Sequence, residues 1–198
     1  MQKSTKQFKI FIIVASTRPG RVGRAIADWF YTQAKKQQSS MQFELVDLID
    51  WNLPLLDESI PAKAHMYQHE HTKRWGAKIS EADGYVIVTP EYNHGYPASL
   101  KNALDYLYHE WSGKSVAFVS YGMGGGRLAV QQLQQVVVEL QMQPLSKQVS
   151  ITFHHDMFNE RHQLVHPEKS LAKYINDSNT LIEALASTLR KGGAHKTA

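Results

Sequence analysis

Three segments of the sequence combine turn-forming residues with hydroxyl, aromatic or basic side chains, and each follows an apolar run. They are STRPGRVGR at 16–24, TPEYNHGY at 89–96 and SYGMGGG at 120–126. Loops of this composition expose backbone N–H groups and side-chain donors. Such groups recognise anions and the polar edges of rings, so these three loops are the candidates for a binding site.

The first loop is suited to a phosphate. A helix expected to begin near Gly20 adds free N–H groups and the positive end of its dipole. The loop matches neither G-x-G-x-x-G nor G-x-x-x-x-G-K-[ST], which argues against a tightly held dinucleotide or nucleoside triphosphate. Alternatively, Ser16 caps the helix and the arginines are solvated. The candidate ligands are Ser16, Thr17, Arg18, Arg21 and Arg24.

The second loop is suited to a flat heterocycle. Pro90, Asn93 and Gly95 favour a tight backbone that leaves N–H and C=O groups available, and Tyr92 offers a ring and a hydroxyl. Glu91 is either a general base or an acceptor that fixes the loop. We expect the second role, because the sequence places no histidine or nucleophile with it.

The third loop has four glycines in the five positions from Gly122 to Gly126. Glycine allows positive φ angles and close approach, so its N–H groups could face a carbonyl or an anionic ring edge. Taken alone, the loop is more simply a plain connection, and its coincidence with the other two loops favours a ligand site.

The elements that must position these loops alternate between short apolar runs and helical patterns. Strands are predicted at 8–15, 41–49, 85–88, 115–120 and 149–153; one helix is predicted from Arg21 onward, and others at 64–82, 97–110, 127–140 and 168–190. Apolar strands that alternate with helices predict an α/β doubly wound fold with a parallel sheet covered on both faces. Ligands of such folds lie beyond the carboxyl ends of the strands, where all three loops fall. We expect one domain over 1–190 and a disordered tail at 191–198.

Composition excludes several classes of chemistry. The 198 residues contain no cysteine, which excludes disulfides, thiolate metal sites and a thiol nucleophile. The net charge is +4, but no block of like charges predicts nucleic-acid binding. The apolar run at 8–15 fits a buried strand better than a signal peptide, and no run is long enough for a membrane span. We expect a cytoplasmic protein without a nucleic-acid or membrane partner.

Histidines gather in HMYQHEH at 65–71 and in His154, His155 and Asp156. Both groups contain metal-ligating residue types, but a solvated surface is the simpler interpretation. We therefore expect no metal site.

Together, ASTRPGRVGRAIADWF, TPEYNHGYPASLKNALDYL and SYGMGGGRLAV resemble the NADPH-dependent FMN reductase family of flavodoxin-like proteins. The resemblance runs from about 8 to 153, and nothing comparable covers 154–198. It implies a flavodoxin-like, doubly wound five-stranded parallel sheet in the order 2-1-3-4-5. It also implies FMN as cofactor, NADPH or NADH as reductant, and hydride transfer through N5 of the flavin to a flavin, quinone, azo compound or similar small acceptor.

The resemblance also implies the site residues. The FMN phosphate would lie in the first loop, the ring against the second, and its pyrimidine edge against the third. The implied contacts are Ser16, Thr17, Arg18 and Arg24, then Pro90, Glu91, Tyr92 and Asn93, then Ser120, Tyr121, Gly122, Gly124 and Gly125. No catalytic side chain is implied, because the flavin carries the chemistry. Two positions depart from the family pattern: Ala15 stands for the usual glycine, and Met123 interrupts the glycines.

Two other functions fit the same fold. A flavodoxin-like electron carrier is one, although flavodoxin phosphate loops lack arginine and flavodoxins are usually acidic. A flavin-binding sensor or interaction module without turnover is the other. The resemblance further implies a homodimer or tetramer through the helix at 97–110, whose end LDYLYHEW is aromatic enough for an interface.

Overall fold

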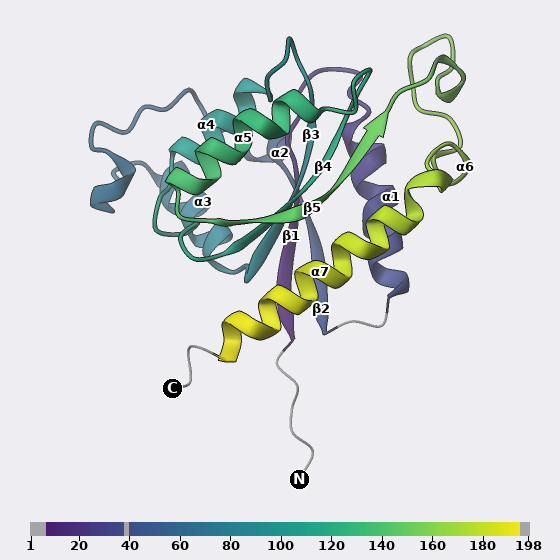
Figure 1. Cartoon of the computed structure of the whole chain (residues 1–198). Helices are drawn as coiled ribbons and strands as arrows, with labels where there is room; N and C mark the ends of the chain where they lie inside the picture. Colours follow the sequence, from purple (N-terminus) through teal and green to yellow (C-terminus); the bar gives the residue numbers. More distant parts are fainter. Residues whose placement is uncertain (1–6, 38–39, 195–198) are drawn as a thin grey trace.

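Five parallel strands form one sheet in this computed structural model, which describes residues 7–37 and 40–194 (Figure 1). The strand order is β2-β1-β3-β4-β5, so the flavodoxin-like topology predicted from the sequence is confirmed. The strands are β1 (Phe8–Val14), β2 (Met41–Asp47), β3 (Gly84–Pro90), β4 (Ser115–Gly122) and β5 (Gln143–Thr152).

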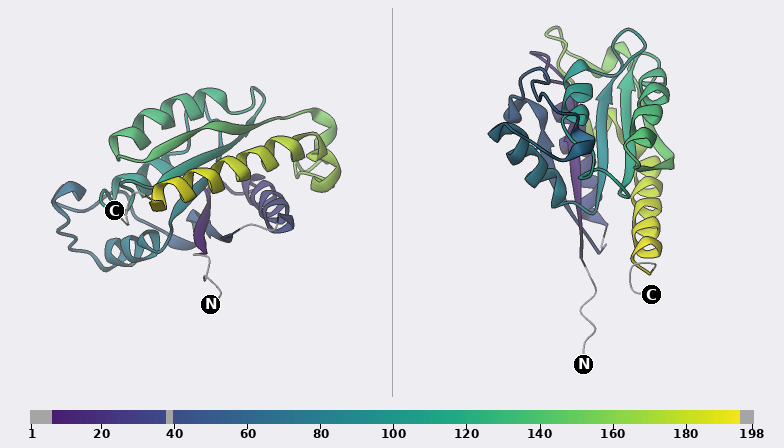
Figure 2. Two further views of the ribbon diagram at one scale, coloured as in Figure 1. Left: turned by 60° about the horizontal axis from the view of Figure 1, so that its bottom comes forward. Right: turned by 90° about the vertical axis from the view of Figure 1, so that its left-hand side faces the viewer.

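Helices cover both faces of the sheet. Along β1, Ile10 and Ile12 belong to one core and Phe11 and Ile13 to the other, because successive side chains of a strand point to opposite faces. The first core packs against α1 (Gly23–Lys36) and α7 (Ile175–Ala194). The second packs against α3 (Glu70–Ser80), α4 (Ala98–Asp105) and α5 (Arg127–Glu139) (Figures 1 and 2). Burial on both faces explains why the strands are apolar throughout.

The strand order places the three loops side by side. β1, β3 and β4 are consecutive neighbours, and all of them end at the same edge because they are parallel. Beyond the last residue of β1, the Ala15 N–H donates to the Val88 carbonyl at 3.0 Å. Thr89 pairs with Ser120, so β3 and β4 end in register. The loops that follow these strands therefore share one edge of the sheet.

Several predicted boundaries were wrong. The first helix begins at Gly23 because a turn precedes it, in which the Arg21 N–H donates to the Arg18 carbonyl at 3.1 Å. The second strand ends at Asp47, whose carboxylate accepts from the Ile49 N–H and so caps a short helix, α2 (Leu48–Trp51). The fifth strand is ten residues long and begins well before the predicted 149–153.

The predicted helices at 64–82, 97–110 and 168–190 also differ. The first begins only at Glu70, since His65 has a left-handed backbone (φ 54°), and the second ends at Asp105. The third is interrupted: α6 (Pro167–Ser170) and a 3₁₀ turn, η3 (Ala172–Tyr174), precede α7. Because α7 continues to Ala194, the tail expected at 191–198 lies partly in this helix, and 195–198 lie outside the described residues. Among the described helices, none has the length and apolar character needed to cross a membrane.

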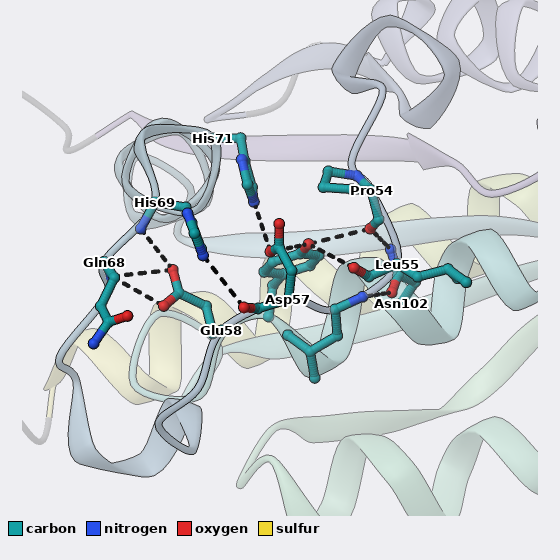
Figure 3. Close-up of polar contacts among 10 residues, drawn as sticks. Pro54, Leu55, Asp57, Glu58, Gln68, His69, His71 and Asn102 are labelled. Atoms are coloured by element: carbon teal, nitrogen blue, oxygen red, sulfur yellow. Dashed lines mark hydrogen bonds and ion pairs between the residues drawn. The ribbon is translucent and has the colours of Figure 1, made fainter.

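A long excursion between α2 and α3, residues 52–69, stands out from the body of the domain (Figures 1 and 2). We call this excursion the arm, and it contains one 3₁₀ turn, η1 (Ala62–Ala64). Outside the arm, another 3₁₀ turn, η2 (His155–Met157), follows β5. The Asn102 side chain of α4 holds the start of the arm, donating to the Pro54 carbonyl at 2.6 Å and accepting from the Leu56 N–H at 2.9 Å (Figure 3).

The far end of the arm is held by its acidic residues (Figure 3). The Asp57 carboxylate lies 2.9 Å from the His71 ring nitrogen and accepts from the Tyr106 hydroxyl at 2.9 Å. The Glu58 carboxylate accepts from the N–H groups of Gln68 and His69 at 3.0–3.1 Å. His71 is therefore a partnered residue that anchors the arm, rather than part of a solvated helix face.

Glu58 makes the anchoring of the arm dependent on pH. Burial is the largest single influence and raises the pKa of Glu58, but the N–H groups of Gln68 and His69, together with the Thr72 hydroxyl and the His69 ring, bring the net pKa below its ordinary value. A carboxylate with a depressed pKa contributes stability above its unfolded pKa of about 4.3, and this contribution is lost as the pH falls through the folded pKa.

We predict that Glu58→Gln lowers the free energy of unfolding at pH 7 by roughly 0.5–1 kcal/mol, because a neutral amide accepts these hydrogen bonds less strongly. The difference from the wild type should shrink as the pH approaches 3.5. Urea unfolding at several pH values measures it, with the exposed Glu160→Gln as a matched control. A difference that stays constant over this range would contradict the assigned role of Glu58.

Candidate active site

The first loop presents unpaired donors at the start of α1. Within the described ranges, no hydrogen bond is made by the backbone N–H groups of Thr17, Gly20 or residues 23–25. The first N–H groups of a helix have no partner in the helix itself, and its dipole adds positive potential there. Together these groups can hold an anion such as a phosphate.

The arginines of this loop differ in their partners. The Arg21 guanidinium lies 2.8 Å from the buried Asp47 carboxylate, and Arg24 pairs with Asp28 at 3.0 Å. Arg18 is exposed, has no carboxylate partner among the described residues, and lies 6.0 Å from the centre of the Tyr92 ring. Arg18 is therefore the arginine whose charge remains available to a ligand, whereas the Arg24 charge is already partly neutralised.

Hydroxyl groups tie the first loop to its neighbours. The Ser16 hydroxyl is fully buried and lies 2.6 Å from the Tyr92 hydroxyl of the second loop. The Ser99 hydroxyl of α4 donates to the Ala15 carbonyl at 2.7 Å. Because the Ala15 N–H is also paired and its methyl group is buried, alanine fits this position where the family usually has glycine.

The second loop is a tight turn that exposes donors. Tyr92 and Gly95 exchange two backbone hydrogen bonds of 2.8 and 2.9 Å. Asn93 and His94 between them have φ angles of 50° and 66°, the left-handed conformation that such a turn requires. Both residues are exposed, and their N–H groups have no partner within the described chain. The turn therefore offers backbone donors next to the Tyr92 ring.

Glu91 fixes the second loop to the third. Its carboxylate accepts from the Leu128 N–H at 3.0 Å, in the first turn of α5, and its own N–H donates to the Tyr121 carbonyl at 3.1 Å. A carboxylate at a helix N-terminus accepts a hydrogen bond from a free N–H and is stabilised by the positive end of the helix dipole. This is the loop-fixing interaction expected from the sequence.

The third loop packs tightly at one end and is open at the other. Gly126 has a φ of 73°, and a Cβ atom there would lie 2.7 Å from both the Ser120 Cβ and the Tyr121 nitrogen. In contrast, no atom lies within 4 Å of a Cβ built on Gly124. A ligand can thus approach the backbone at Gly124. The interrupting Met123 is 79% exposed, so it does not obstruct the packing of the loop.

Two of the expected pyrimidine contacts serve the loop itself. The Ser120 hydroxyl donates to the Gly125 carbonyl at 2.7 Å, and the Gly125 N–H donates to the Gly122 carbonyl at 3.1 Å. The Tyr121 side chain is buried and points toward the first loop, where a Cβ on Gly23 would lie 2.4 Å from its hydroxyl. Nothing in the sequence predicts this contact, since the two residues are distant along the chain.

A hollow of about 160 Å³ adjoins the first loop. Its lining residues are Thr17, Leu48, Ile49, Asn52, Leu53, Ser99, Asn102 and Ala103. A larger hollow, of about 510 Å³, lies between α1 and the amino-terminal half of β2, among residues such as Tyr31, Lys35 and Phe43. The smaller hollow is the candidate binding site despite its lower volume, because Thr17 of the first loop lines it, whereas no residue of the three loops lines the larger one.

Comparison with known proteins identifies the family. The family model for NADPH-dependent FMN reductase matches residues 8–156. The chain belongs to the NADPH-dependent FMN reductase family. It is 42% identical over 171 residues to an NAD(P)H-dependent FMN reductase of Schizosaccharomyces pombe, covering 85% of this chain and 84% of that protein. It is 34% identical over 142 residues to a quinone reductase of Pseudomonas putida, covering 68% and 72%.

A solved structure shares the fold of this FMN reductase family member. It is FerB, a flavoenzyme NAD(P)H:(acceptor) oxidoreductase from Paracoccus denitrificans, with a TM-score of 0.70 and 21% identity over 93% of this chain and 98% of that one. The protein is thus a flavin-dependent NAD(P)H oxidoreductase with FMN as its cofactor, as its sequence predicted. The residues present fit FMN, because an anion site and an open, donor-bearing loop lie at the same edge of the sheet.

Substitution of Glu91 distinguishes an anchor from a general base. We predict that Glu91→Ala lowers the free energy of unfolding by about 1 kcal/mol, because a helix cap is lost. Glu91→Gln keeps an acceptor oxygen, so flavin reduction by NADPH should change by less than about threefold. Urea unfolding and stopped-flow absorbance measure the two effects. A fall in the reduction rate of about 10²-fold or more in Glu91→Gln would indicate a general base instead.

Proposed function

We propose that this FMN reductase family member passes electrons from NADPH to a small planar acceptor, a quinone or a free flavin. The printed names of its relatives, FMN reductase and quinone reductase, support this class of acceptor. The observation that carries the proposal is the meeting of three loops on neighbouring strands. The first has an arginine without a carboxylate partner and N–H groups without a hydrogen-bond partner among the described residues, the second has an exposed ring, and the third has open glycine backbone.

Each loop has a separate binding role in this proposal. The N–H groups at the start of α1, with Thr17 and Arg18, hold the phosphate. The ring lies against Tyr92 and the exposed N–H of Asn93. The open backbone at Gly124 faces the pyrimidine edge, since the Gly125 N–H is already used within its own turn.

The side chains of the site position the reactants and do not transfer protons. FMN, when bound, supplies the centre that accepts a hydride and passes two electrons onward. The Glu91 carboxylate is occupied by the Leu128 N–H, and Ser16 is buried against Tyr92. With the loops on one side of the ring, reductant and acceptor use the same opening in turn, which predicts ping-pong kinetics.

An anaerobic absorbance spectrum of the FMN-loaded protein tests the proposal. We expect NADPH to bleach the bound flavin. A benzoquinone or free FMN should then reoxidise it at least as fast as the enzyme turns over in the steady state. Bound flavin that stays oxidised with NADPH and with NADH would indicate an electron carrier or a sensor. Reduced flavin that is reoxidised only by one-electron acceptors would contradict the proposed acceptor class.

Arginine substitutions test the phosphate assignment. We predict that Arg18→Ala weakens FMN binding about tenfold or more, the loss expected for one charge-assisted hydrogen bond. Arg24→Ala serves as the matched control and should have a smaller effect, because Arg24 is paired with Asp28. Dissociation constants from flavin fluorescence give the comparison. Equal losses of FMN affinity in both variants would show that the Arg24–Asp28 ion pair does not reduce the contribution of Arg24 to phosphate binding.

We also propose a homodimer that uses α4 and the adjoining start of the arm, or a tetramer built from it. Leu55 and Leu56 expose apolar side chains at the start of the arm, with Leu55 83% exposed, and Ile49 of the preceding helix α2 is 42% exposed. Asn102 ties the start of the arm to α4. Exposed apolar groups that gather beside one helix are typical of an interface.

Light scattering measures this assembly. We expect a dimer or tetramer at micromolar concentration, and a shift toward monomer when Leu55 and Leu56 are both changed to Ser. Val138→Ser is the control, because Val138 is 58% exposed and belongs to α5 and not to α4 or the start of the arm. A monomeric wild type would contradict the proposal.

Cytoplasmic location is also a proposal. The apolar run near the start of the sequence is strand β1, which is buried in the sheet. Cell fractionation followed by detection of the native protein tests the location directly.

A further inference from the structure

Tyr121 is a buried tyrosine whose hydroxyl interacts with the buried Ser16 side chain of the first loop. It is 3% exposed and lies near the carboxyl end of β4. Two other buried tyrosines use their hydroxyls in the fold: Tyr85 donates to the Ile79 carbonyl at 2.8 Å and Tyr106 to the Asp57 carboxylate at 2.9 Å. The Tyr121 hydroxyl instead meets the first loop, where the candidate phosphate ligands lie.

The hydroxyl is aimed at the start of α1. A Cβ atom built on Gly23, the first residue of that helix, would lie 2.4 Å from the Tyr121 hydroxyl oxygen and 3.3 Å from the ring carbon that bears it. The phenol therefore reaches across from β4 to the proposed phosphate site, under N–H groups that have no hydrogen-bond partner in residues 7–37 and 40–194. Only glycine at this position leaves room for it.

The hydroxyl is a donor at neutral pH. Burial raises the pKa of Tyr121, with a smaller contribution from Tyr92, and Arg18, Ser16 and Arg21 lower it less. A protonated phenol can donate to an anion without bringing a charge of its own into the buried site.

We propose that the Tyr121 hydroxyl is a ligand of the FMN phosphate, donating to it from beneath the start of α1, and that Gly23 provides the space for it. The phosphate would thus be held by two different strands, β1 through its loop and β4 through Tyr121. This inference rests on the proposed FMN site. It moves Tyr121 from the pyrimidine edge, where the resemblance placed it, to the phosphate.

Riboflavin separates a phosphate ligand from a ring contact, because it has the same ring and no phosphate. We expect Tyr121→Phe to weaken FMN binding about tenfold or more, as for the loss of a hydrogen bond to a charged group, and to change riboflavin binding by less than about twofold. Flavin fluorescence titrations of the apoprotein give both constants. Tyr85→Phe is the matched control, a buried tyrosine far from the loops, and should leave the ratio of the two constants unchanged.

The outcomes are distinguishable. Equal losses for FMN and riboflavin in Tyr121→Phe would assign Tyr121 a structural or ring-side role and overturn the inference. Unchanged binding of both flavins would overturn it as well, and would indicate that the hydroxyl serves only its contact with Ser16. A wild type that binds neither flavin would refute the proposed cofactor site itself, which is a different result.

Gly23→Ala keeps the phenol and tests the same contact from the other side. Its methyl group would displace the hydroxyl, so FMN binding should weaken while riboflavin binding is retained. The double variant Gly23→Ala/Tyr121→Phe lacks the hydroxyl that the new methyl group would displace. We therefore expect its FMN affinity to be no lower than that of Tyr121→Phe alone. Fully additive losses would overturn the link between the two residues. Melting curves of each apoprotein show whether it is folded before binding is compared.

Discussion

A parallel sheet that is buried on both faces can offer a ligand only its edges. Helices cover both sides here, so side chains in the middle of the strands are committed to the two cores. All five strands end at the same edge, and the order β2-β1-β3-β4-β5 makes the strands that carry the three loops direct neighbours. Every feature of the site depends on this adjacency, because residues separated by more than 70 positions meet there, as Ser16 and Tyr92 do.

The loops at this edge are fixed to one another before any ligand arrives. The first is joined to the second by the Ser16 and Tyr92 hydroxyls, and the second to the third by Glu91 and Leu128. Tyr121 connects the third to the first through its contact with Gly23. Connected loops lose little conformational freedom when they bind a ligand, so more of the interaction energy remains as affinity.

Much of this arrangement could be predicted from the sequence. Apolar strands alternating with helices specify a doubly wound sheet, and loops rich in glycine and proline after those strands specify its binding edge. The loop-fixing role of Glu91 was also predictable, since no histidine or nucleophile stood beside it. These inferences use only local composition and periodicity, which a single sequence carries.

Other features depend on tertiary contacts that periodicity does not report. The direction of the Tyr121 side chain is set by the gap that Gly23 leaves in a helix from another part of the chain. The late start of α3 follows from the left-handed His65 and from Glu58, which binds the N–H groups just before the helix. The sequence does not show which arginine of the first loop keeps its charge available to a ligand, because the ion pairs of Arg21 with Asp47 and of Arg24 with Asp28 form only in the fold.

The most direct measurement is a crystal structure of the protein in complex with FMN. The phosphate should lie at the start of α1, within hydrogen-bonding distance of Arg18 and the backbone N–H of Thr17, with the ring against Tyr92 and its pyrimidine edge at Gly124. A flavin phosphate bound elsewhere, or a ring placed in the hollow between α1 and β2, would contradict the assignment of this edge as the cofactor site.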